Sequence, residues 1–93
     1  MIALAIPDPH PATDGHFPGA PVLPAVVLLD EVLHGLAARG ERGPWRITAA
    51  KFLKPVLPGE RLTLRLEPQA GGAFRFTLAR DGTPVATGQL AGA

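Results

Sequence analysis

Apolar residues occupy every second position in two runs near the end of the chain, Leu62–Leu66 and Phe74–Leu78. The residues between them are charged, hydroxyl-bearing or small, which is typical of strands with one apolar face and one wet face. Asp81-Gly82 follows the second run, and this pair strongly favours a two-residue hairpin. The pattern therefore predicts consecutive antiparallel strands, with a further strand at Val85–Leu90 after the hairpin, and we expect more strands at residues 2–6 and 45–52.

A helix is predicted from Ala25 to Ala38. Pro24 suits a helix start because a first-turn residue needs no N–H donor, and Gly40 suits the position after the last turn. Residues 25–29 are apolar all round, so we expect this end of the helix to be buried. An antiparallel sheet of similar length can cover such a helix, which predicts an α+β fold.

Asp30 interrupts the apolar start of this helix. Acids are seldom fully buried unless they are paired, so two interpretations remain open. In one, Asp30 begins the solvent-facing side and pairs with His34 at i+4, although Glu31 is the stronger candidate for plain exposure. In the other, Asp30 is a buried acid with a chemical role.

Length and composition predict one domain over residues 1–93. The sequence has no cysteine, so disulfides and thiolate chemistry are excluded. No stretch approaches the length of a membrane span and no signal peptide is visible, which favours a cytoplasmic protein. The three histidines, His10, His16 and His34, have no compact spacing, so we expect no metal site.

The charge distribution is uneven although the formal net charge is only +1. Residues 1–38 contain four acids and no base, and residues 39–93 contain nine bases and four acids, giving −4 and +5. The small net charge and the lack of interleaved aromatic residues argue against nucleic-acid binding. One basic stretch forms either a docking patch for an anionic partner or an ordinary solvated surface: Arg39, Arg42, Arg46, Lys51 and Lys54.

Two ordered motifs identify a resemblance. The first, His16 to Pro24, reads His-Phe-Pro-Gly-Ala-Pro-Val-Leu-Pro, and Asp30 stands fourteen positions after the histidine. The second, Lys51 to Glu60, reads Lys-Phe-Leu-Lys-Pro-Val-Leu-Pro-Gly-Glu. Together they resemble the hot-dog-fold 3-hydroxyacyl-acyl-carrier-protein dehydratases of the FabA/FabZ type, and the short members of aryl-polyene pathways look most similar. The resemblance implies an antiparallel sheet wrapped around one central helix.

The same resemblance implies a reaction and a set of roles. His16 would take the proton from C2 of a 3-hydroxyacyl thioester, and Asp30 would donate a proton to the departing C3 hydroxyl. The backbone amides of Ala25 and Val26, at the positive end of the helix dipole, suit the developing thioester oxyanion. The substrate loop would comprise Phe17, Pro18 and Gly19.

We expect no cofactor, and a substrate carried by acyl carrier protein or coenzyme A. In the family the histidine and the acid come from opposite subunits, which implies a homodimer or higher oligomer, or a heterodimer. Ala25 stands where the family has glycine, and if the site requires positive φ there, alanine is strained. A thioesterase in which Asp30 or Glu31 activates water, and a non-catalytic acyl-binding subunit of a heterodimer, remain alternatives.

Overall fold

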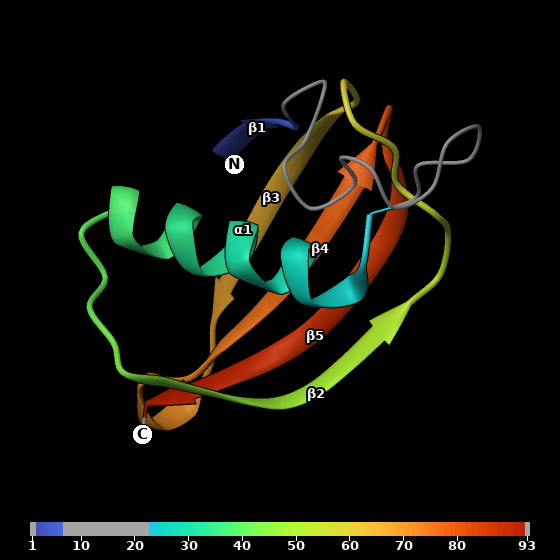
Figure 1. The fold of residues 1–93 in the computed structure, drawn as a ribbon. Helices are drawn as coiled ribbons and strands as arrows, with labels where there is room; N and C mark the ends of the chain where they lie inside the picture. The colour runs from blue at the N-terminus through green and yellow to red at the C-terminus, as the bar shows by residue number, and fades with distance from the viewer. Residues whose placement is uncertain (1, 7–22, 93) are drawn as a thin grey trace.

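One helix lies against one face of a five-stranded antiparallel sheet (Figure 1). The structure is a computed structural model that describes residues 2–6 and 23–92. The strands are arranged in the order β1-β3-β4-β5-β2. In chain order the elements are β1 (Ile2–Ala5), α1 (Ala25–Ala38), β2 (Trp45–Phe52), β3 (Arg61–Pro68), the short 3₁₀ turn η1 (Ala70–Gly72), β4 (Phe74–Arg80) and β5 (Thr83–Gly92).

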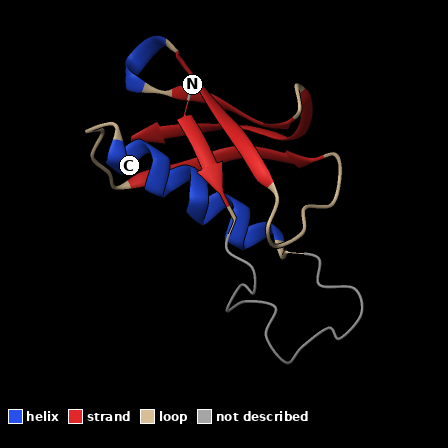
Figure 2. Ribbon diagram, turned by 90° about the horizontal axis from the view of Figure 1, so that it is seen from above, coloured by secondary structure: helices blue, strands red, loops and turns tan. Residues whose placement is uncertain are grey.

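The core lies between the helix and the curved sheet, and Figure 2 shows the two layers from above. Leu28, Val32 and Leu36 of α1 are buried together with the inward-facing residues of the sheet. The alternation predicted for residues 62–66 and 74–78 is confirmed, since their apolar members are all buried. This arrangement is the predicted α+β hot-dog fold.

Gly35 sets how closely the helix approaches the sheet. It is buried in α1, and a Cβ built on it would lie 2.5 Å from Leu64 Cδ2 of β3. Glycine usually weakens a helix by up to about 1 kcal/mol relative to alanine. Here it allows tight packing, and α1 continues without interruption to Ala38.

The helix ends as the sequence predicts. Gly40 has φ +90°, and its N–H donates to the Ala37 carbonyl at 3.0 Å. The N–H of Glu41 donates to the Leu36 carbonyl at 2.9 Å. These two bonds form a Schellman motif, which satisfies carbonyls that the last helical turn leaves without partners.

Strand β2 is an exposed edge of the sheet, because it pairs only with β5 in the part of the chain that the structure describes. Seven of its eight residues are exposed, and only Trp45 is half-buried. The register shifts between Ile47 and Ala49, as in a β-bulge. Consequently Ile47 and Phe52 lie on the helix side, opposite buried Leu90 and Ala86, whereas Lys51 lies on the outer side.

Across the described residues, no helix has the length and apolar character needed to cross a membrane.

Candidate functional site

An apolar cleft opens beside the start of α1. Its volume is about 340 Å³. The helix and the residue that leads into it form one wall, and the end of β2 and the segment after it form the other. The lining residues are Leu23, Ala25, Leu28, Phe52, Leu53, Lys54, Pro55 and Val56. Most of these side chains are apolar, so the cleft suits a hydrocarbon group, with one ammonium group at Lys54.

The first turn of α1 presents backbone donors at this cleft. Pro24 precedes the helix with extended backbone angles, φ −61° and ψ 149°, and no side chain caps the helix start. The first amides of a helix have no partner within the helix, and they form the positive end of its dipole. Ala25, the first residue of the helix, lines the cleft.

Ala25 does not have the positive φ that would strain an alanine. Among the described residues other than glycine, only Asp81 has a positive φ. Ala25 is helical. The strain expected for alanine at a left-handed position therefore does not arise in this structure.

Asp30 is exposed, as the first of the two open interpretations predicts, whereas Glu31, the stronger candidate for plain exposure, is half-buried. The Asp30 side chain is 61% exposed, and its Oδ2 lies 3.6 Å from His34 Nε2. The expected burial of residues 25–29 is also incomplete, since Val26 is 69% exposed. The reason is that only one face of α1 packs on the sheet, and Val26, Asp30 and His34 are spaced by four residues along another face.

His16 and the predicted substrate loop of Phe17, Pro18 and Gly19 lie outside the described residues. The proximity of His16 and Asp30 stays a prediction. Asp30 and Ala25 lie on the same helix, and of the two only Ala25 lines the cleft.

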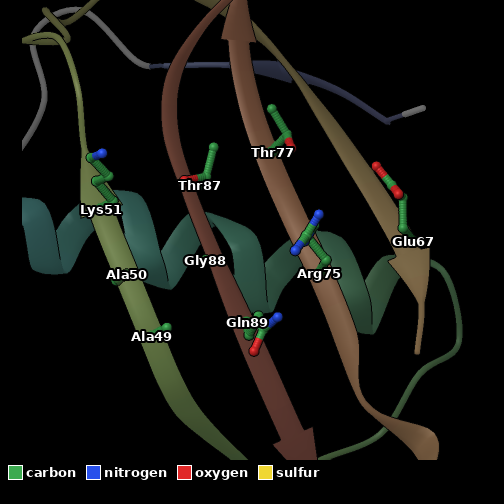
Figure 3. A pocket seen from close by; sticks show the side chains of 9 residues that line it. All are labelled: Ala49, Ala50, Lys51, Glu67, Arg75, Thr77, Thr87, Gly88 and Gln89. Atoms are coloured by element: carbon green, nitrogen blue, oxygen red, sulfur yellow. The ribbon is translucent and has the colours of Figure 1, made fainter. Parts of the chain in front are cut away.

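The five basic residues proposed for docking occupy different parts of the molecule, and all are exposed. Arg39 caps the C-terminal end of α1, whereas Lys54 lines the cleft at its start. Lys51 lies on the face of the sheet opposite the helix (Figure 3). Lys54 is thus the member of this set that lines the cleft.

A second hollow of about 500 Å³ lies on that outer face. Figure 3 shows Lys51 and Arg75 on its two sides, with α1 behind the sheet. Its remaining lining is polar or small and comprises Ala49, Ala50, Glu67, Thr77, Thr87, Gly88 and Gln89. The sheet separates this hollow from the start of α1, so we do not assign it to the same site.

Sequence reasoning missed one residue near the cleft, Arg80. Its Nη1 lies 2.8 and 2.9 Å from the two carboxylate oxygens of Glu60, and it donates to the Pro55 carbonyl at 3.0 Å. Glu60 was noted as the last residue of the second motif. Arg80 stands twenty positions later, on another strand, and no local pattern marks it. Its only signal is an arginine at the end of a strand, just before Asp81-Gly82.

In the described part of the chain, no group of three His, Asp or Glu side chains gathers closely enough to hold a metal ion.

Comparison with known proteins identifies relatives of this chain. Residues 1–89 match the ApeI-like family, which is described as ApeI dehydratase. A 3-hydroxyacyl-acyl-carrier-protein dehydratase FabZ of Myxococcus xanthus is 41% identical over 62% of this chain and 45% of its own length. The FabZ of Chlamydia trachomatis serovar L2 is 38% identical over 87% of this chain and 63% of its own length.

The chain thus spans about half to two thirds of the length of these curated relatives. Among solved structures it is similar to a chain of the dehydratase heterocomplex ApeI:P from Xenorhabdus doucetiae. That match has a TM-score of 0.77 and 27% identity, and it covers 96% of this chain and 81% of the other. With the fold, the two motifs and the cleft, these matches show that the chain belongs to the ApeI-like family of hot-dog dehydratases.

Proposed function

We propose that this chain removes water from a 3-hydroxyacyl thioester on acyl carrier protein and forms the trans-2-enoyl thioester, in fatty-acid or polyene synthesis. The observation that carries the proposal is the apolar cleft at the N-terminal end of α1. One of its walls comes from the second of the two motifs shared with FabA/FabZ enzymes, and Ala25 of the other wall carries a first-turn amide. Its relatives include FabZ dehydratases and a chain of the dehydratase heterocomplex ApeI:P.

In the proposed reaction His16, neutral at working pH, removes a proton from C2 of the substrate. The electron pair of the C2–H bond forms the C2–C3 double bond as the C3–O bond breaks. Asp30, in its protonated form, gives its proton to the departing hydroxyl, which leaves as water. The amides of Ala25 and Val26 stabilise the thioester oxygen while negative charge builds on it.

Because Asp30 is exposed in this single chain, the proposed reaction requires a surface that covers its carboxyl group. Exclusion of water favours the protonated form of a carboxyl group near neutral pH. We propose that a partner subunit covers Asp30. Among the described residues of this single chain, five large apolar side chains are exposed: Val26, Ile47, Phe52, Leu53 and Leu57. They lie on the start of the helix, on the helix side of β2 and on the segment that follows β2. Exposed apolar groups of this kind mark surfaces that bind another protein.

We therefore propose that the edge strand β2 pairs with a second hot-dog subunit. An unpaired edge presents a row of N–H and C=O groups that another strand can satisfy. The second subunit is either a copy of this chain or a different hot-dog chain, and the heterocomplex named in the solved relative supports the latter. This leaves a second candidate function, an acyl-binding subunit whose partner carries out the chemistry.

The test is to incubate the purified protein, alone and with its co-purifying partner, with a 3-hydroxyacyl group on acyl carrier protein. Absorbance of the enoyl thioester and release of free thiol are followed in parallel. Dehydration predicts enoyl product without thiol. Release of thiol would instead support a thioesterase, and retained acyl binding with neither product would support the non-catalytic subunit.

A further inference from the structure

The segment between β2 and β3 forms the outer wall of the cleft, and a side chain from a distant strand holds it. Residues 52–56 contribute Phe52, Leu53, Lys54, Pro55 and Val56 to the lining. Proline has no N–H, so the polar attachment at Pro55 is its carbonyl. That carbonyl accepts a hydrogen bond from Arg80 Nη1 at 3.0 Å, across a separation of 25 residues.

The same guanidinium nitrogen also holds the carboxylate of Glu60. Nη1 lies 2.8 and 2.9 Å from the two carboxylate oxygens, and Glu60 Oε1 accepts the N–H of Leu57 at 2.6 Å. The chain between the wall and β3 is thereby tied at Pro55, Leu57 and Glu60 to one side chain of β4. Hydrogen bonds between charged groups are shorter and stronger than neutral ones.

Partial burial makes this pair stronger than an ordinary surface ion pair. The Arg80 and Glu60 side chains are only 29% and 24% exposed, so solvent screens them less than it screens fully exposed charges. Arg80 is the last residue of β4 and directly precedes the tight turn at Asp81 and Gly82, which have φ values of 51° and 79°.

The wall is also coupled to the start of the helix. The N–H of Leu23 donates to the Val56 carbonyl at 2.9 Å, and both residues line the cleft. A shift of the wall therefore acts on the residue that leads into α1. Leu23 and Val56 also belong to the hydrophobic core, whereas Phe76 and Leu78 of β4 are core residues outside this hydrogen-bond network.

We infer that Arg80 and Glu60 are positioning residues that fix the Leu53–Val56 wall of the cleft, and thereby set how a long acyl chain is seated. That the ligand is an acyl chain rests on the proposed function, whereas the fixing of the wall does not. The pair touches neither the C2 nor the C3 chemistry. Its loss changes substrate binding more than turnover.

The first test needs no activity. Amide hydrogen exchange is measured on the wild type, on Arg80→Met and on Glu60→Gln. Arg75→Met is the matched control, since Arg75 is an exposed arginine of the same strand on the outer face. We expect the amides of Leu57 and Leu23 to exchange about tenfold faster in both Arg80→Met and Glu60→Gln, because each variant weakens the charge-assisted bonds that hold the wall.

Amides of the buried strand residues Leu64 and Phe76 should keep their wild-type exchange in the same variants. Unchanged exchange at Leu57 and Leu23 would overturn the inference. A uniform rise at all four amides would also overturn it, because it would show a general role in stability and none in positioning the wall.

The second test compares 3-hydroxyacyl substrates with short and long chains. For Arg80→Met we expect KM for the long chain to rise about tenfold, with kcat within about twofold of wild type and little change for the short chain. Arg80→Lys should restore part of the loss, since an ammonium group keeps the charge but not the guanidinium geometry. An equal fall of kcat for both chain lengths would contradict the inference.

The two tests separate this inference from the proposed function. If the wild type forms no enoyl product, the dehydratase proposal fails, and binding of the fluorescent fatty acid cis-parinaric acid replaces the kinetic assay. Weaker probe binding by Arg80→Met than by Arg75→Met then supports the inference that Arg80 fixes the wall. Equal binding by these two variants overturns it.

Discussion

The substitution Gly88→Ala tests the packing that holds the exposed edge strand in place. Gly88 of β5 lies opposite Ala50 of β2 and next to Phe76 of β4. A Cβ at this position would overlap the backbone carbonyl oxygen of Ala49 and the ring of Phe76. Phe76 is fully buried and the carbonyl belongs to β2, so neither can move aside easily.

The expected loss follows from this geometry. Overpacking a tight core costs about 1–3 kcal/mol. Because Gly88→Ala meets a backbone atom as well as a buried ring, we expect the upper half of that range, about 2–3 kcal/mol. For a domain of this size about 1 kcal/mol lowers the melting temperature by about 4–8 °C, so the melting temperature should fall by about 10–20 °C.

Gly92→Ala is the matched control on the same strand, because a Cβ at Gly92 meets no atom within 4 Å. We expect its unfolding free energy to change by no more than about 0.5 kcal/mol. Thermal and urea unfolding of the wild type and both variants, followed by circular dichroism, measures the difference. If Gly88→Ala is as stable as Gly92→Ala, the close contact between β2, β4 and β5 described above is wrong.

Three further changes have defined outcomes. Gly40→Ala should lower the free energy of unfolding by about 1–2 kcal/mol in a urea titration, because its φ of +90° is strained for residues with a side chain; an unchanged stability would refute the helix-end geometry. Phe52→Glu should reduce the molar mass measured by light scattering to that of one chain, because it places a charge in the proposed subunit contact; an intact oligomer would place that contact elsewhere. Lys54→Ala, but not Arg39→Ala, should raise KM several-fold for the carrier-bound substrate, because Lys54 lines the cleft whereas Arg39 caps the far end of α1; equal KM values would exclude a docking role for Lys54.

The fold follows closely from local patterns. The helix bounds of Ala25–Ala38 and the strand bounds of Trp45–Phe52 agree with those predicted. The helix bounds could be predicted because Pro24 and Gly40 act on their own neighbourhood through backbone geometry, as the alternating leucines of β3 do through a period of two. The Asp81-Gly82 turn is of the same kind, with both φ values positive as its hairpin type requires.

Features that depend on the third dimension were not predictable in this way. The packing role of Gly35 has no local signal, because it depends on Leu64 of β3, which lies far along the chain. Asp30 lies on an exposed face because α1 packs on the sheet along one side only. The start of the helix is apolar on all sides, so the sequence does not indicate which side that is. The contact of Arg80 with Glu60 and Pro55 joins the end of β4 to the segment between β2 and β3, and it leaves no periodic signal.

The candidate site was identified differently, by two motifs that resemble those of a family. They marked the segment Lys51–Glu60 and the start of the helix. The structure places residues 52–56 of that segment and Ala25 of the helix on two sides of one cleft. Charge clustering in the sequence was a poorer guide. Lys51 and Lys54 are three residues apart, yet they line different hollows, because Lys51 lies on the outer face of the strand and Lys54 follows the end of that strand.

The most direct test of the central claim is the initial rate of enoyl-thioester formation from a carrier-bound 3-hydroxyacyl substrate, measured for the wild-type assembly and for His16→Ala and Asp30→Asn. The account predicts that each variant folds and assembles as the wild type does, yet loses at least about 10²-fold in rate. His34→Gln, which alters the exposed neighbour of Asp30, should keep the wild-type rate. Folded His16→Ala and Asp30→Asn proteins that turn over substrate at the wild-type rate would contradict it.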